Sequence, residues 1–143
     1  MKWALVAVCS ALALAGCATA PAPPEVQAAH FGPVLPAPSP EALANAQLIE
    51  GLRWLSRPDA NNYIMAYPRD AWFAEAESTV SLSCIIQTDG RFACAAAPDK
   101  WPQFDFEQAA RNLSTLLRVA PHSFSGEATA GRRFDLRIVF RLY

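Results

Sequence analysis

The sequence predicts a small α+β domain in which helices cover one face of an antiparallel sheet. Three observations predict it: a β-hairpin pattern over 80–96, an alternating apolar pattern over 134–142 and a helical apolar stripe over 106–117. A strand with one apolar and one polar face is typical of an antiparallel sheet that is covered on one side. The helical stripe supplies the cover.

The hairpin is the most specific of these patterns. Apolar residues alternate with mostly polar ones over 80–86, and Thr-Asp-Gly at 88–90 supplies a turn. A three-residue loop with Gly90 in the left-handed conformation places Cys84 directly opposite Cys94 on the apolar face. A two-residue Asp-Gly loop would put them out of register. The sequence therefore predicts a Cys84–Cys94 disulfide, which would stabilise the fold by roughly 2–3 kcal/mol.

Helix signals precede the hairpin. Ser39-Pro40-Glu41 supplies an N-cap, a proline at the first helical position and an acid in the first turn. A leucine stripe then predicts a helix over 41–56 that ends before Pro58.

Two shorter helices and a capped longer one complete the helical layer. One short helix is expected over 59–66, and Pro68 opens the next, with Ala71 and Trp72 facing inward. After the hairpin, Asp105-x-x-Gln108 fits a capping box at the start of the helix that carries the 106–117 stripe.

The last segment alternates without a break, which predicts a strand with one wet face. Its inward residues are Phe134, Leu136, Ile138, Phe140 and Leu142, and its outward residues are Asp135, Arg137, Val139 and Arg141.

The N-terminal segment is typical of a bacterial secretory signal rather than of a folded element. A lysine at position 2 precedes an unbroken apolar or small run over 4–15, and Leu-Ala-Gly-Cys over 14–17 matches the bacterial lipobox. This pattern predicts cleavage after Gly16 and a lipid on Cys17. An uncleaved membrane anchor is the alternative, because residues 3–20 are about as long as the shortest spanning helix, roughly 17–25 residues.

The residues after Cys17 indicate which membrane the lipoprotein is expected on and predict a tether. Ala18 replaces the aspartate that usually retains lipoproteins at the inner membrane, so we expect the periplasmic face of the outer membrane, with inner-membrane anchoring as the alternative. That compartment is oxidising and favours the disulfide. A proline-rich stretch then forms a semi-rigid spacer that reaches on the order of 70 Å when fully extended. The expected organisation is a signal peptide over 1–16, a tether over 17–40, a helix over 41–57 and the folded domain over 58–143.

Composition argues against several classes of function. With 12 basic and 13 acidic side chains and a net charge of −1, no basic footprint points to nucleic acid. His122 is the only histidine of the folded region, and no nucleophile, base and orienting group can be assembled around it, so we do not expect an enzyme. No Cys/His spacing suits a metal, and no cofactor is expected. The tryptophans at 54, 72 and 101 are interpreted as core or interface residues.

Six motifs follow one another in the folded region. They are Tyr67-Pro68-x-x-Ala71, Val80-x-Leu82-x-x-x-Ile86 with Asp89-Gly90, Phe106-x-x-Ala109-Ala110, Arg118-x-x-Pro121, Gly126, and Ile138-x-Phe140-x-Leu142. In this order the chain resembles the C-terminal domain of TonB, the energy transducer, over 58–143. The resemblance implies helices on one face of a three-stranded antiparallel sheet.

The resemblance also implies a way of binding. TonB domains present the edge of their last strand to the TonB-box peptide of an outer-membrane receptor, and the peptide adds as a further strand. The implied peptide-binding edge consists of Phe134, Asp135, Leu136, Arg137, Ile138, Val139, Phe140, Arg141 and Leu142. Arg133, Arg137 and Arg141 would flank this edge. A solvated strand face that discourages aggregation is the alternative for these arginines.

The function expected from the sequence is therefore a lipid-anchored, periplasm-facing module that binds an extended peptide of an envelope transport protein, linked to TonB-type transmembrane transport. Coupling to the proton-driven motor is not expected, because no histidine lies between Met1 and Cys17. An envelope-scaffolding lipoprotein that binds peptidoglycan or another membrane protein is the alternative. A homodimer through exposed edges stays open.

Overall fold

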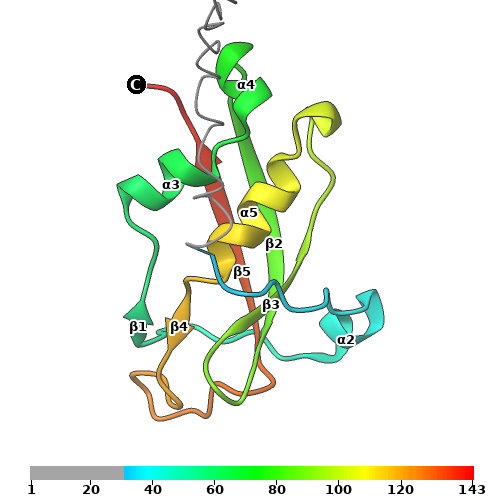
Figure 1. Ribbon diagram of the computed structural model, residues 1–143. Coiled ribbons are helices and arrows are strands. Elements are labelled where there is room, and N and C mark those ends of the chain that lie inside the picture. The colour runs from blue at the N-terminus through cyan, green and yellow to red at the C-terminus, as the bar shows by residue number, and fades with distance from the viewer. Residues whose placement is uncertain (1–30) are drawn as a thin grey trace, which may run out of the picture.

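A three-stranded antiparallel sheet forms the centre of the protein. The computed structural model describes residues 31–143 (Figure 1). The predicted signal peptide and Cys17 lie outside the described residues. The sheet has the order β3-β2-β5 and is built from β2 (Ser78–Ile86), β3 (Phe92–Ala96) and β5 (Arg133–Phe140). With the helices described below, it confirms the predicted α+β class.

One face of the sheet carries the core. The inward residues of β2, from Val80 to Ile86, are at most 1% exposed. They pack beneath α5 (Phe106–Ser114), whose Phe106 and Leu113 are fully buried. Two shorter helices, α3 (Ala60–Ala66) and α4 (Arg69–Phe73), lie toward the far end of β5 (Figure 1). The side chain of Asp59 caps α3 by accepting a hydrogen bond from the N–H of Asn62 at 2.9 Å.

The hairpin has the register that its turn predicts. Gln87 N–H donates to the Arg91 carbonyl at 2.8 Å, and Gly90 has φ +81°. Cys84 and Cys94 are direct partners in the ladder.

The helix predicted over 41–57 is wrong beyond its first turns. The helix α2 spans only Pro40–Asn45, after an N-cap at Ser39. The chain then runs extended, and β1 (Trp54–Ser56) pairs with β4 (Arg118–Val119) in a second, two-stranded sheet. Backbone partners from distant parts of the chain compete with the helix here, because extended residues can bond to β5 and β4.

The predicted leucine stripe consequently does not form one buried face. Leu48 and Leu55 are 61% and 64% exposed, whereas Ile49 and Leu52 are buried. Gly51 has φ +65°, a left-handed conformation that interrupts a helix at this point.

Three further expectations are corrected. Trp72 is 48% exposed while its neighbour Ala71 is fully buried, because the short α4 turns only one side to the core. Asp105 has φ +56° and its side chain caps nothing, since a left-handed residue cannot fold its carboxylate back onto α5. The last strand ends at Phe140, so Leu142 lies beyond it. The helix α5 begins after a short 3-10 helix, η1 (Pro102–Phe104).

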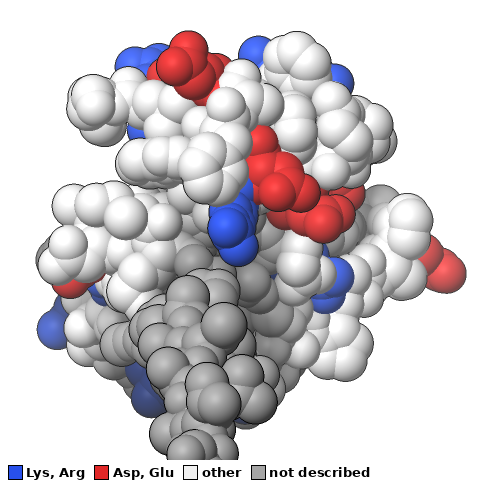
Figure 2. Space-filling view, turned by 45° about the horizontal axis from the view of Figure 1, so that its top comes forward, with Lys and Arg blue, Asp and Glu red and all other residues white. Residues whose placement is uncertain are grey.

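Charges of both signs are interspersed over the surface. On the face shown in Figure 2, acidic and basic side chains lie among a majority of uncharged residues. Described ion pairs join Arg91 to Asp89 at 2.6 Å and Arg133 to Asp135 at 2.9 Å.

Candidate functional site

The strand β5 is an edge strand with open backbone groups. Arg133 donates its N–H to the Gln47 carbonyl at 2.9 Å, and its carbonyl accepts from the Ile49 N–H at 3.0 Å, on the side away from β2. Because strand groups alternate with a period of two, the N–H and C=O of Asp135, Arg137 and Val139 face the same way. Among residues 31–143, no strand pairs with them on that side.

A groove of about 380 Å³ lies beside this free edge. Its helical wall includes Tyr63 and Ile64 of α3 and Trp72 of α4, and its other wall is β5 with Val139. Ile64, Trp72 and Val139 are 59%, 48% and 39% exposed, which is unusual for apolar side chains that line one depression. The groove can therefore take apolar groups next to backbone donors and acceptors.

Rigid aromatic packing supports the groove from below. The ring of Tyr67 meets those of Phe140, Trp72 and Phe106 edge-on, with centroids 5.5–5.7 Å apart. The Tyr67 hydroxyl donates to the buried Ala76 carbonyl at 2.5 Å. Burial raises the pKa of Tyr67, with a further contribution from the Glu77 carboxylate.

Two arginines flank the groove. Arg137 and Arg141 are exposed and contribute to its lining. Within the described part of the chain, neither guanidinium donates a hydrogen bond to a protein group. Burial raises the pKa of the nearby Tyr63, and the Arg57 guanidinium partly offsets that rise. Arg57 lines an adjacent depression together with Tyr63 and Arg137, so a third arginine lies close to the groove.

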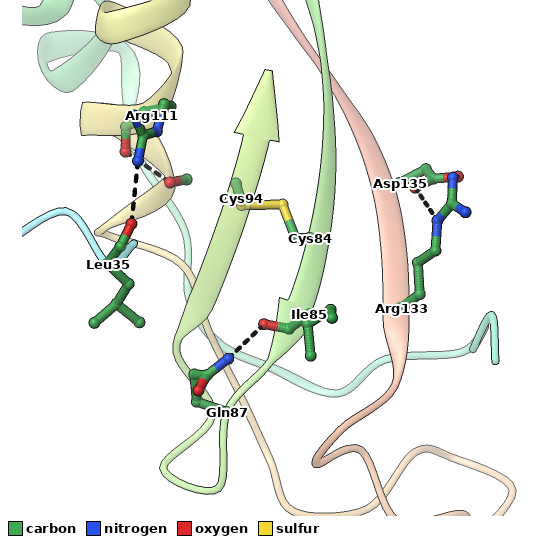
Figure 3. Close-up of a disulfide and its surroundings, with 9 residues drawn as sticks. Leu35, Cys84, Ile85, Gln87, Cys94, Arg111, Arg133 and Asp135 are labelled. Carbon is green, nitrogen blue, oxygen red and sulfur yellow. Dashed lines mark hydrogen bonds and ion pairs between the residues drawn. A yellow bond between two sulfur atoms is a disulfide. The ribbon is translucent and has the colours of Figure 1, made fainter. Parts of the chain in front are cut away.

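Arg133, the third predicted flanking arginine, has a different role. Its guanidinium pairs with Asp135, with Nε and Nη2 2.9 and 3.0 Å from the two carboxylate oxygens (Figure 3). It also donates to the Leu43 carbonyl at 3.3 Å. Its backbone is occupied by the 47–49 segment. The structure therefore separates Arg133 from the groove and brings Arg137 and Arg141 to it.

The disulfide lies on the core face and not at the groove. Cys84 and Cys94 are bonded across the hairpin with a Cα–Cα distance of 4.0 Å, and both are buried (Figure 3). This cross-link joins β3 to β2 and does not involve β5, at the opposite edge of the sheet.

The remaining motif residues lie at the hairpin end of the sheet. Asp89 accepts from the Arg91 N–H at 3.1 Å, which lowers the pKa of its carboxyl group together with the Arg91 guanidinium. A Cβ on Gly90 would lie 2.3 Å from the Val119 carbonyl oxygen. The Pro121 carbonyl accepts a hydrogen bond from the Thr129 N–H at 2.9 Å. The Gly90 carbonyl accepts from the Val119 N–H at 3.1 Å, so the hairpin turn lies against β4. Of the other motif residues, Tyr67 lines the groove and Pro68 precedes α4.

The sequence did not identify Tyr63, Ile64 and Trp72 as groove residues. The available signal was the uninterrupted apolar run at 63–66, since a short helix that is apolar on adjacent positions must turn part of that surface outward.

Comparison with known proteins adds no family assignment. No family model matches the chain, and no curated protein matches it at a significant level. Two findings concern residues 31–143 alone: no helix there is long and apolar enough to cross a membrane, and no group of three or more His, Cys, Asp or Glu side chains is placed to hold a metal ion.

Proposed function

We propose that this domain binds an extended peptide by adding it as a fourth strand to the free edge of β5. The observation that carries the proposal is the row of open backbone groups at Asp135, Arg137 and Val139 beside an apolar groove. In β-strand addition, main-chain hydrogen bonds provide affinity, and pockets for alternate side chains provide selectivity. Both are available on this edge.

The TonB-like order of motifs supports a particular class of partner. We propose that the peptide resembles a TonB box and belongs to an envelope transport protein, so that the module contributes to TonB-type transmembrane transport. The lipobox supports a lipid on Cys17 that holds the domain at the periplasmic face of the outer membrane. The proposal does not include coupling to a proton-driven motor.

The test is an NMR titration of the protein with a peptide copied from a receptor TonB box. Strand addition predicts that the amide signals of Asp135, Arg137 and Val139 shift most, because their N–H groups gain new acceptors. Amides of β3, on the opposite edge, serve as the internal control. Unchanged β5 signals at millimolar peptide would refute the proposal.

Selective N-methylation of the peptide distinguishes strand addition from side-chain docking. In an added strand only alternate peptide N–H groups point to β5. Methylating these should abolish binding, whereas methylating the intervening ones should leave it largely unchanged. Equal effects from both sets would contradict a strand-like bound form.

A further inference from the structure

We propose that the β5 edge selects peptides that carry two carboxylates four residues apart with apolar residues between them. This inference rests on the proposed strand addition and specifies its ligand. Its basis is the spacing of Arg137, Val139 and Arg141 along the edge, together with the apolar helical wall of the groove.

The outer face of the sheet sets the positions of the carboxylates. Arg137 and Val139 are exposed strand residues two positions apart, so they share the face away from α5. Arg141, the first residue after β5, is exposed at the next step of two and lines the same groove. Residues directly opposite in an added strand lie on the same face, about 5 Å away. An acidic residue opposite Arg137 and another opposite Arg141 are therefore four positions apart, whether the peptide runs parallel or antiparallel. The residue opposite Val139 is best apolar.

The inner face sets the residues between these positions. Side chains at the intervening positions of an added strand point to the other face, where α3 and α4 lie (Figure 1). There they meet Tyr63, Ile64 and Trp72, which line the groove. Exposed apolar surface favours apolar side chains at these positions, because their burial removes both surfaces from water.

The neighbouring carboxylates make contacts other than with Arg137 and Arg141. The Asp135 carboxylate is held by Arg133, and the Glu77 carboxylate accepts from the Leu142 N–H on the β2 side of the strand. Arg57 shares an adjacent depression with Tyr63 and Arg137. A peptide with carboxylates thus meets two arginines that have no acidic partner within the described residues.

The chain itself limits the length of the ligand. Residues 47–49 already occupy the strand position beside Arg133, parallel to β5. An added strand can therefore extend to residue 135 and no further toward the start of β5. A seven-residue peptide whose second and sixth residues lie opposite Arg137 and Arg141 covers residues 136–142, about 23 Å at ~3.3 Å per residue.

The experiment compares three acetylated and amidated heptapeptides. The probe is Ser-Glu-Val-Val-Val-Glu-Ser, and its two analogues carry Gln or Lys in place of both Glu residues. We expect the Glu peptide to bind the protein about tenfold more tightly than the Lys peptide, with the Gln peptide between them. The difference should shrink as salt is raised, because the charges are exposed.

Charge reversal supplies the matched test. In the double variant R137E/R141E the order should invert, so that the Lys peptide binds best, and this gain shows that the variant is folded. The control variant R53E/R118E has the same change in net charge, on exposed arginines near the second sheet, and should keep the wild-type order.

The outcomes separate the two proposals. Equal binding of all three peptides, with β5 amide shifts, would overturn the charge selection and leave strand addition standing. A wild-type order that persists in R137E/R141E would overturn the assignment to these arginines. Failure of every peptide to shift β5 amides would overturn strand addition itself.

Discussion

Among single residues, Gly90 is constrained by a close backbone approach as well as by its turn. With φ at +81°, its added Cβ would lie 2.3 Å from the Val119 carbonyl oxygen. Gly90→Ala should therefore cost about 2–4 kcal/mol of unfolding free energy, from left-handed strain plus a clash between backbones. The matched control is Gly126→Ala, where φ is +85° but nothing lies within 4 Å, so urea denaturation should show a loss of only about 1 kcal/mol. Equal losses would contradict the steric argument.

The Tyr67 hydroxyl gives a second residue-scale prediction. Tyr67→Phe leaves the buried Ala76 carbonyl without its donor, which should cost about 1–3 kcal/mol at neutral pH. Burial raises the pKa of Tyr67 above its ordinary value of 10.0, so the neutral form is favoured in the folded state. That stability is complete below about pH 10 and is lost as the pH rises through the folded-state pKa.

Wild-type protein should therefore lose more stability than Tyr67→Phe as the pH rises above about 10. Part of the alkaline loss should remain in the variant, because burial also raises the pKa of Tyr63. Urea denaturation along a pH series measures both effects, with the exposed Tyr143→Phe as control. If the stability of wild type and of Tyr67→Phe falls in parallel with pH, ionisation of Tyr67 is not the cause of the loss.

Among the elements, the hairpin β2–β3 depends on its cross-link. The double variant Cys84→Ala/Cys94→Ala should lose roughly 2–3 kcal/mol of unfolding free energy, mainly because the unfolded chain regains freedom. Reducing agent should lower the stability of wild type toward that of the variant and leave the variant itself unchanged. Urea denaturation with and without reductant measures both effects. If reductant leaves the unfolding free energy of the wild type unchanged, the disulfide does not stabilise the fold.

Elements whose signals are local were predictable, and those decided by distant partners were not. The hairpin register follows from Thr-Asp-Gly at 88–90, and the inward face of β5 follows from a period of two. The extended run after α2 could not be foreseen, since it depends on backbone bonds to Arg133 and to β4. The edge of β5 was expected from a resemblance, but the groove was not. The helical wall of the groove depends on where Ile64 and Trp72 lie. The sequence pattern assigned Ile64 to no face and Trp72 to the core.

On the scale of the whole molecule, the end of the predicted 17–40 tether belongs to the folded domain. The Gly32 N–H donates to Thr115 Oγ1 at 3.0 Å, and Arg111 donates to the Leu35 carbonyl at 3.1 Å, so the last part of the proline-rich stretch lies on α5. The part of the chain that is bound to the domain therefore begins at least as early as Gly32, and not at residue 41 or 58.

The proposed lipid anchor is tested by substituting the two cysteines nearest the N-terminus, Cys9 and Cys17. If Cys17 carries the lipid, Cys17→Ser should move the protein from the membrane fraction to the soluble fraction or leave an unprocessed precursor. Cys9→Ser should change neither, because cleavage after Gly16 would remove Cys9 with the signal peptide. Mass spectrometry of the mature N-terminus should find diacylglyceryl-Cys17. An intact Met1 would instead favour an uncleaved anchor, and the groove of β5 would then be presented from the inner membrane rather than beside outer-membrane receptors.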